Sequence, residues 1–439
     1  MLWKKINMLV LAMVLFPLQF LGQSYTLTEL VQKALEENYQ LQIARNYEQM
    51  AQNRNTYGFA GFLPSVNVTG EQVWGIQNTE QSFFTGEVRS GDNALNTRFN
   101  AMAEVDWTVF DGFSMFARKD RLGHLARLGK METRFFIEQT ITDIAHVYNQ
   151  LIKEKQLLQI YRQSAEFSSF RLNLESRKRQ VGAGSTLLYN QALMDFNSDS
   201  VLLSDQQMLV KELQIQINRN INEPPSYEVH PMDEHIELLG VESSDVLLER
   251  ALENNMNLER AHLEEMLADA DYRIQRGRQY PQVSVFGNYA FTEQTSELGF
   301  VESSLQYGGQ FGIRVRFNLY DGGRERIQLR NLQLEQRNMS LDKQDTHAHL
   351  ESEIARLKNR YNAYLGQKEL LQESLEAARQ TLSIASEQLE AGSISGFDFR
   401  QAQITALMVE VQVVELQYRI KSVEIDLYRI SGDLLDKVL

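Results

Sequence analysis

Charged residues at two-residue spacing are the side chains of this sequence best placed to do chemistry. Glu104 and Asp106 form one such pair, and Arg314 and Arg316 form another. Residues two apart in a β-strand point to the same face, so each pair would project acids or bases from one side of a sheet. Such a face either lines a water-filled space or holds ion pairs between the two segments.

The sequence otherwise shows no pattern typical of an enzyme. It contains no nucleophile–base arrangement, phosphate-binding loop or paired-acid motif. It has no cysteine, which excludes disulfides and thiolate metal sites. His347 and His349 are two residues apart, so a helix would direct them to different faces. We therefore expect no catalytic residues, no cofactor and no metal site.

Four alternating segments would carry the charged pairs. The clearest two have apolar faces formed by Phe99, Ala101, Ala103, Val105, Trp107 and Val109, and by Phe311, Ile313, Val315, Phe317 and Leu319. Val283–Thr292 alternates as well, and Val66–Trp74 does so more faintly. Alternation over about 9–11 residues suits a tilted transmembrane strand. It also suits a half-buried strand of a soluble sheet, and the strands alone leave both interpretations open.

Long helices should follow the strands. Residues 112–222 and 323–439 contain no proline, which would break a helix. Each stretch predicts a helix of about 70 residues, roughly 105 Å long. The second has a heptad pattern typical of a coiled coil, formed by Leu350, Ile354, Leu357, Tyr361, Tyr364, Leu371, Leu375, Ala378, Leu382, Ala385 and Leu389. A glycine-containing turn and a returning helix come next in each stretch.

The sequence contains an internal tandem duplication. Ala34–Asn38 recurs as Ala251–Asn255, and the proline of Leu63–Val66 recurs in Tyr280–Val283 at the same offset. Later landmarks, such as Gln191-Ala192 and Gln401-Ala402, repeat at an offset shorter by seven residues. Constant spacing over several landmarks makes chance a poor explanation.

These landmarks predict the organisation of the 439-residue chain. Residues 1–22 have a basic start and a short apolar run, and they read as a secretory signal peptide. Residues 23–222 form the first repeat, 223–243 a proline-rich linker that forms an equatorial region, and 244–439 the second repeat. The net charge of −14 disfavours nucleic acid as a partner. Each repeat supplies two strands, and four strands cannot close a barrel, so membrane insertion would require oligomerisation.

The sequence resembles the TolC-like outer membrane efflux protein family over essentially its whole mature length. The resemblance rests on the strand starts Leu63–Val66 and Tyr280–Val283, the strand ends Phe110–Gly112 and Tyr320–Gly323, the turn Leu389–Asp398 with Gln401-Ala402, and the ending Leu427–Gly432.

This resemblance implies a fold that is mainly α with β. A long coiled-coil α-helical barrel in the periplasm would continue a transmembrane β-barrel in outer-membrane lipid, with four strands per subunit and twelve in a homotrimer. The implied function is a passive export conduit for efflux or type I secretion. It would dock onto a periplasmic adaptor, also called a membrane fusion protein, and an inner-membrane transporter. The alternative is a periplasmic coiled-coil scaffold or adhesin without transport activity.

The resemblance also implies site residues. The adaptor-docking tips would be Gly182, Ala183, Gly184 and Ser185, and Gly392, Ser393, Ile394, Ser395 and Gly396. Asp398 would form a pore constriction, or else serve only as an acid at a helix N-terminus. Gln401 and Leu188 stand where further acids can occur, which argues against a strong acidic ring. Glu104, Asp106, Arg314 and Arg316 would line the barrel lumen.

Overall fold

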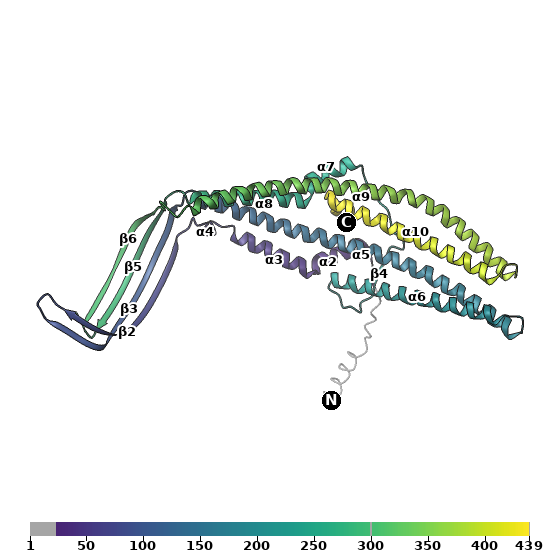
Figure 1. Cartoon of the computed structure of the whole chain (residues 1–439), viewed down its shortest axis with the longest axis horizontal. Coiled ribbons are helices and arrows are strands. Elements are labelled where there is room, and N and C mark those ends of the chain that lie inside the picture. Colours follow the sequence, from purple (N-terminus) through teal and green to yellow (C-terminus); the bar gives the residue numbers. More distant parts are fainter. Residues whose placement is uncertain (1–22, 299–300, 439) are drawn as a thin grey trace, which may run out of the picture. The chain divides into compact units, whose positions relative to one another are not determined.

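The computed structural model of the chain describes residues 23–298 and 301–438, and its elements are labelled in Figure 1. The signal peptide expected at residues 1–22 lies outside the described residues. The chain is mainly helical with one four-stranded sheet, as the sequence predicts. None of the helices in the described part is long and apolar enough to cross a membrane.

Apart from α4 in the first half and α11 in the second, the elements follow one another in the same order in the two halves. The first half contains β1 (Gln23–Tyr25), α2 (Leu27–Glu37), α3 (Tyr39–Arg54), α4 (Tyr57–Ala60), β2 (Ser65–Ser82), β3 (Val88–Phe110), α5 (Ser114–Gln180) and α6 (Thr186–Asn220). The second contains β4 (Val229–Pro231), α7 (Ser244–Asn254), α8 (Met256–Gly277), β5 (Gln282–Ser296), β6 (Ser303–Arg316), α9 (Arg324–Glu390), α10 (Gly396–Ser431) and α11 (Leu434–Val438). A duplication predicts this order, and the repeat boundaries stay predictions.

Internal contacts divide the chain into two compact units. The first, which we call the helical unit, contains the described residues up to Arg45, Thr133–Leu258 and those from Thr346 onward. The second, the sheet unit, contains Asn46–Glu132 and Glu259–Asp345. Each unit combines segments from both halves of the chain, so compact units and sequence repeats are different divisions.

The sequence predicts one opening helical segment in each half, at roughly 26–60 and 244–279, and the structure interrupts both. The first breaks at Asn38 and the second at Asn255, with similar backbone angles (φ −66°, ψ 120° and φ −69°, ψ 122°). Each asparagine side-chain oxygen accepts hydrogen bonds from two backbone N–H groups of the next helix, at 2.8 and 3.3 Å and at 3.0 and 3.3 Å. Asparagine is a preferred helix N-cap, which explains the break in both halves.

The long helices and their returns match the prediction closely. α5 and α9 each contain 67 residues, and α6 and α10 contain 35 and 36. The heptad positions of α9 that are buried are Leu350, Ile354, Leu357, Tyr361, Ala378, Ala385 and Leu389. The apolar heptad therefore packs against neighbouring helices of the helical unit.

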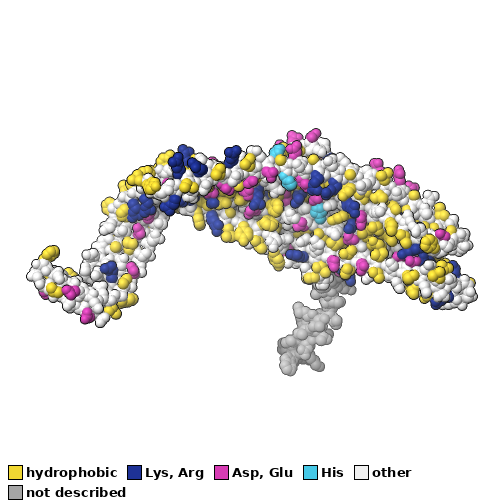
Figure 2. Space-filling view, in the orientation of Figure 1, with side chains coloured by type: hydrophobic (Ala, Val, Ile, Leu, Met, Phe, Trp, Pro, Cys, Tyr) yellow, Lys and Arg dark blue, Asp and Glu magenta, His cyan; other side chains and the backbone are white. Residues whose placement is uncertain are grey.

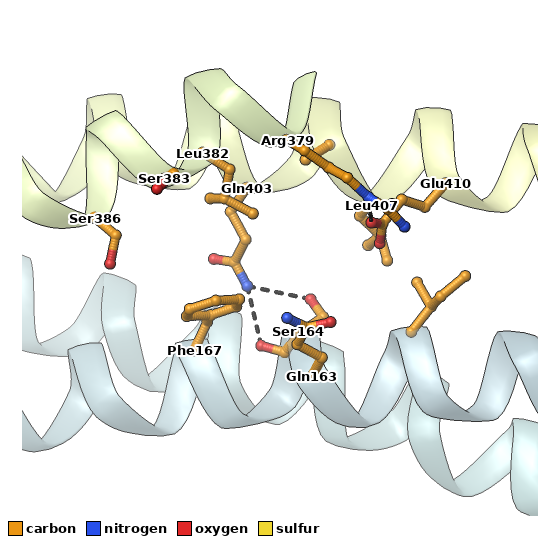
Figure 3. Close-up of a pocket in the computed structure, with 12 residues that line it drawn as sticks. Gln163, Ser164, Phe167, Arg379, Leu382, Ser383, Ser386, Gln403, Leu407 and Glu410 are labelled. Atoms are coloured by element: carbon orange, nitrogen blue, oxygen red, sulfur yellow. Dashed lines mark hydrogen bonds and ion pairs between the residues drawn. The ribbon is translucent and has the colours of Figure 1, made fainter. Parts of the chain in front are cut away.

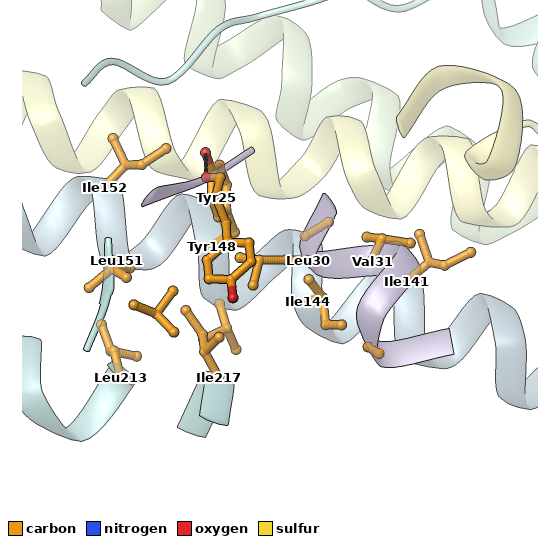
Figure 4. Close-up of a cluster of buried hydrophobic side chains, with 14 of the residues drawn as sticks. Tyr25, Leu30, Val31, Ile141, Ile144, Tyr148, Leu151, Ile152, Leu213 and Ile217 are labelled. Atoms are coloured by element: carbon orange, nitrogen blue, oxygen red, sulfur yellow. Dashed lines mark hydrogen bonds between the residues drawn. The ribbon is translucent and has the colours of Figure 1, made fainter. Parts of the chain in front are cut away.

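A buried hydrophobic cluster of the helical unit surrounds Tyr148 of α5 (Figure 4). Leu30 of α2, Leu151 of α5 and Ile217 of α6 are 0–1 % exposed in this cluster. The Tyr148 hydroxyl donates to the carbonyl oxygen of Tyr25 at 3.1 Å and to Asp233 Oδ2 at 2.7 Å. Burying each such side chain contributes about 1.5–3 kcal/mol, so the cluster fixes β1, α2 and α6 on the middle of α5.

The sheet has the order β2-β3-β5-β6, and all its neighbours are antiparallel. Its strands contain 18, 23, 15 and 14 residues, more than the sequence predicts. The fourth strand ends at Arg316, so Phe317 and Leu319 lie beyond it. Among the described residues no strand pairs with the outer edge of β2 or of β6.

The strand register gathers the apolar residues on one face of the sheet. Val66 pairs with Val105, and Val285 pairs with Ile313. This apolar face is open to solvent in a single chain: Val68 is 80 %, Ile313 71 % and Phe311 92 % exposed. Figure 2 shows hydrophobic side chains at the surface of the strands. The alternating pattern seen in the sequence is therefore confirmed, with its apolar side unburied.

The two strand-to-helix connections of the sheet unit differ. At the first connection, a Cβ added to Gly112 would lie 2.0 Å from the carbonyl oxygen of Gly277. The C-terminal end of α8 therefore packs directly on this turn. At the second, Gly322 and Gly323 have positive φ (76° and 81°). No described atom outside the turn lies within 4 Å of an added Cβ at either position.

Candidate functional site

The two turns that join the long helices to their returns share a left-handed glycine and one backbone hydrogen bond. Gly182 and Gly392 are left-handed, with φ of +74° and +72°. Each is followed by a residue whose N–H donates to a carbonyl five residues earlier, at 2.9 Å in both turns. This Schellman arrangement ends a helix at a glycine. The predicted tips at Gly182–Ser185 and Gly392–Gly396 are therefore well-formed turns, and their adaptor-docking role stays a prediction.

Each returning helix starts at a serine cap. Ser185 accepts a hydrogen bond from the Leu187 N–H at 3.2 Å. Ser395 accepts from the Asp398 N–H at 3.2 Å and donates its hydroxyl to Asp398 Oδ2 at 2.7 Å. Asp398 also accepts from the Ser395 N–H at 3.3 Å, which completes a capping box. Asp398 thus has a structural role at the helix start, and its predicted pore role stays untested.

The tips differ at the residue before the serine cap. A Cβ on Gly184 would lie 2.5 Å from the backbone nitrogen of Arg179, so this position accepts only glycine without a shift of the turn. The corresponding Ile394 instead packs its side chain on a cluster that contains Leu389 and Phe399. Ala183 and Ser393 occupy equivalent positions in the two turns, and both are exposed.

A cluster of buried polar side chains lies near the tips, and sequence analysis missed it. Arg400 of α10 donates to both carboxylate oxygens of Asp199 on α6, at 2.6 and 2.8 Å. Ser164 and Ser168 of α5 also donate to that carboxylate. Gln403 donates to the Ser164 carbonyl and hydroxyl oxygens at 3.0 and 3.1 Å. These contacts join both helical hairpins of the chain.

A second ion pair extends the cluster toward the second tip. Arg171 of α5 pairs with Asp195 of α6 and donates to the carbonyl oxygen of Gly396 at 3.0 Å. Burial and the neighbouring Arg400 charge lower the pKa of Arg171, while Asp199 and Glu175 oppose that shift. Buried charges persist only when paired, so four charged side chains here compensate one another. We call Arg171, Asp195, Asp199 and Arg400, with Ser164, Ser168 and Gln403, the polar cluster.

The sequence contained one usable signal for the polar cluster. Asp195 and Asp199 are four residues apart on α6, so they share a helix face with apolar neighbours. Acids on an otherwise apolar face require a buried partner. Their partners lie up to about 200 residues away in the sequence, beyond the reach of any local pattern.

A cavity of about 500 Å³ lies beside the polar cluster, between α5, α9 and α10. Figure 3 shows Gln403 bonded to Ser164 beside the Phe167 ring, with Arg379 directed toward Glu410. The Arg379 Nε donates to Glu410 Oε1 at 2.8 Å. The lining is thus mixed apolar and ionic. Among the described residues, no group of three or more potential metal ligands occurs here.

The polar face of the sheet brings together two of the four predicted lumen residues. Arg314 Nη1 lies 3.3 Å from Asp106 Oδ2, and its guanidinium lies 4.7 Å from the centre of the Phe286 ring. Glu104 and Arg316 have no ion-pair partner within the part of the chain that the structure describes. The sequence left open whether these charges line a lumen or pair with each other, and one pair does form.

Comparisons with known proteins agree with this architecture. Residues 247–433 match the family model described as outer membrane efflux protein. A search of curated protein sequences found no significant match.

Solved structures share the fold at low sequence identity. A membrane protein from Pseudomonas aeruginosa is 15 % identical, with a TM-score of 0.76 over 92 % of this chain and 93 % of that one. The outer membrane protein VceC from Vibrio cholerae is 16 % identical, with a TM-score of 0.74 over 92 % and 96 %. The CmeC outer membrane channel of Campylobacter jejuni is 14 % identical, with a TM-score of 0.76 over 93 % and 86 %. Residues 247–433 thus match the outer membrane efflux protein model, and the chain as a whole has the fold of these TolC-like outer membrane channels.

Proposed function

We propose that this chain is one subunit of a homotrimeric outer-membrane channel, a passive conduit from the periplasm to the exterior in a tripartite export system. The observation that carries the proposal is the open four-stranded sheet, whose apolar face is exposed and whose other face is polar. Lipid would cover the apolar face, and the polar face with Glu104, Asp106, Arg314 and Arg316 would line the lumen.

The open sheet edges support assembly from several copies. Unpaired backbone groups cannot face lipid, because each would cost several kcal/mol. The edge of β2 must then pair with β6 of another copy. Two copies would give about eight strands, a number whose interior is filled by side chains. Three copies give twelve, which leaves room for a conduit.

The helical unit offers a matching contact between copies. Apolar residues that are 48–65 % exposed recur every seven positions on α6, and we call them the α6 stripe: Leu187, Met194, Val201, Met208 and Ile215. Exposed apolar residues recur at the same interval along α9 and at the first residue after it, and we call them the α9 stripe: Ala363, Leu370, Ala377, Ile384 and Ala391.

The two stripes fit one another in antiparallel alignment. α6 runs away from its tip and α9 runs toward its own. With both tips level, Met194 meets Ile384, Met208 meets Leu370, and the other three pairs set a larger residue against alanine. The periodicity is that of a coiled-coil seam. Each chain would therefore present its α6 stripe to the α9 stripe of the next copy.

The tips would meet the periplasmic adaptor, which links the channel to the inner-membrane transporter. Their exposed turns at Gly182 and Gly392 stand at the ends of the long helices, where a partner can reach them. In this proposal Asp398 narrows the pore beside the second tip, and the partner proteins supply the energy for export.

Reconstitution of the full-length protein tests the proposed function. We expect the chain to fractionate with the outer membrane and to require detergent for extraction. The purified protein should run as a trimer that heat dissociates, and it should conduct ions across a planar bilayer. A monomer extracted without detergent, with no conductance, would favour the scaffold or adhesin and refute the conduit.

A further inference from the structure

The two tips carry opposite charge. Arg177, Lys178 and Arg179 form the last turn of α5 and are exposed. The last turn of α9 contains no basic residue, and it holds the exposed acids Glu387 and Glu390 instead. We call the first set the cationic tip. The second set, with Asp398, is the anionic tip.

This difference arises within the repeat pattern itself. Arg177 and Glu387 stand at corresponding positions of the two halves, so equivalent sites carry charges of opposite sign. The glycines that end the two helices are alike, with φ of +74° at Gly182 and +72° at Gly392. Turn geometry therefore does not account for the reversal.

Helix stability does not require Glu387 and Glu390 of the anionic tip. The C-terminus of a helix carries a partial negative charge, so cations stabilise it and acids destabilise it. The basic last turn of α5 follows this preference, whereas Glu387 and Glu390 oppose it. Neither acid has an ion-pair partner within 4 Å among the described residues. Residues that destabilise a helix and have no ion-pair partner are expected at functional surfaces.

The charges stand next to apolar side chains that a partner can cover. Val181 is 78 % exposed beside the cationic tip, and Phe397 is 70 % exposed beside the anionic tip. The tips adjoin one another, because Arg171 of α5 donates to the carbonyl oxygen of Gly396. A cavity of about 280 Å³ next to the tips is lined by residues of α5, α6 and α10, including Leu188 and Phe397.

We propose that the two tips form one docking surface with a positively charged and a negatively charged part, a two-sign surface. Its partner is a protein that presents acidic side chains to the cationic tip and basic side chains to the anionic tip. This inference rests on the proposed function and names the chemistry of the docking partner. A polyanion such as a nucleic acid or an anionic membrane would be repelled by Glu387 and Glu390. A protein surface with both signs complements both tips, and such complementarity fixes orientation as well as rate of association.

Photo-crosslinking in the native host tests the proposal on the full-length chain. A benzophenone amino acid replaces Phe397, and the yield of its protein adduct is measured. One background reverses the cationic tip (Arg177→Glu, Lys178→Glu, Arg179→Glu), a second reverses the anionic tip (Glu387→Lys, Glu390→Lys), and a third combines both. The matched control reverses two exposed acids on α7, Glu249→Lys and Glu253→Lys.

We expect each single reversal to lower the adduct yield about fivefold or more, because several complementary charges are replaced by like charges. The control should leave the yield unchanged. The combined reversal should also fail, since the partner keeps its own charges. Recovery in the combined variant would overturn the proposal, because it would mean that the tips pair with each other. An adduct with a second copy of this chain, or unchanged yields, would overturn it as well.

The same cells separate this inference from the proposed function. Outer-membrane fractionation and heat-dissociable trimers report on the channel, and the exposed charges should leave both unchanged. Trimers with unchanged adduct yields would refute only the two-sign surface. Absence of wild-type trimers would refute the proposed function itself.

Discussion

Glu138 of α5 is a buried acid whose charged form is disfavoured in the folded helical unit. It is 7 % exposed, and burial raises its pKa to about 7, although Arg134 and Arg429 act in the opposite direction. The ordinary pKa of the group is 4.5. Between these values the folded chain keeps a proton that the unfolded chain has released. The resulting stabilisation is fully present below about pH 4.5 and is lost as the pH rises through about 7.

Glu138→Gln should therefore stabilise the protein at pH 8 and have little effect at pH 4.5. A shift of this size corresponds to about 3 kcal/mol at most. Thermal denaturation of the purified protein at both pH values measures the difference. Asp143→Asn, which changes an exposed acid of the same helix, is the control. An equal pH dependence in wild type and Glu138→Gln would contradict the assignment.

Arg400 and Asp199 should depend on each other for stability. The side chain of Asp199 is 2 % and that of Arg400 14 % exposed, so loss of one partner leaves a buried charge uncompensated. Arg400→Leu should cost about 3–5 kcal/mol. Arg400→Leu combined with Asp199→Asn should cost less than Arg400→Leu alone, because it removes the orphaned charge. Chemical denaturation of the wild type, the two single variants and the double variant measures the coupling, and a loss in the double variant equal to the sum of the two single losses would exclude it.

At the scale of elements, the glycine turns give a direct test of the tips. Gly392 needs φ of +72°, and its N–H donates to the Leu389 carbonyl at 3.1 Å. Proline fixes φ near −65° and has no N–H, so Gly392→Pro must rebuild the turn. We expect export to be lost while trimers remain in the membrane.

Gly392→Asn is the control for this change, because asparagine adopts left-handed backbone at modest cost. It should retain most export. Normal export by Gly392→Pro would remove the second tip from the docking proposal.

Much of the element order could be predicted from the sequence, because its boundaries are set by local chemistry. Pro64 and Pro281 directly precede the first strand of each half, glycines end the long helices, and the heptad marks the buried side of α9. The helix breaks at Asn38 and Asn255 could not be predicted. In the sequence, an asparagine between apolar helix positions looks like an exposed helical residue, and only the structure shows its capping hydrogen bonds. Strand lengths were underestimated, because alternation fades where both faces are polar.

The candidate site was predictable only where it depends on neighbours in the chain. The tips could be placed, because turn glycines and serine caps are local signals. The polar cluster could not, because Asp199 and Arg400 meet only after two distant hairpins have packed. The pairing of Arg314 with Asp106 across β5 likewise depends on a strand register that single segments do not specify.

At the scale of the whole molecule, the matched stripes predict a specific contact between copies. Met208→Cys combined with Leu370→Cys should form disulfide-linked dimers and trimers under mild oxidation of membranes. Met208→Cys with Ala377→Cys is one heptad out of register, about 10 Å along the helix, and should link poorly. Non-reducing electrophoresis compares the two. Equal yields would contradict the antiparallel alignment of α6 with α9.

The unequal strand-to-helix connections have a consequence for how the protein matures. At Gly112 the turn is already closed by Gly277 of the same polypeptide, whereas Gly322 and Gly323 stand uncovered. The turn at Gly112 is thus packed by its own chain. The turn at Gly322 and Gly323 would be packed only by a surface of another copy. Because such a subunit reaches its full stability only at sufficient local concentration, newly exported single chains should be the form most exposed to proteases.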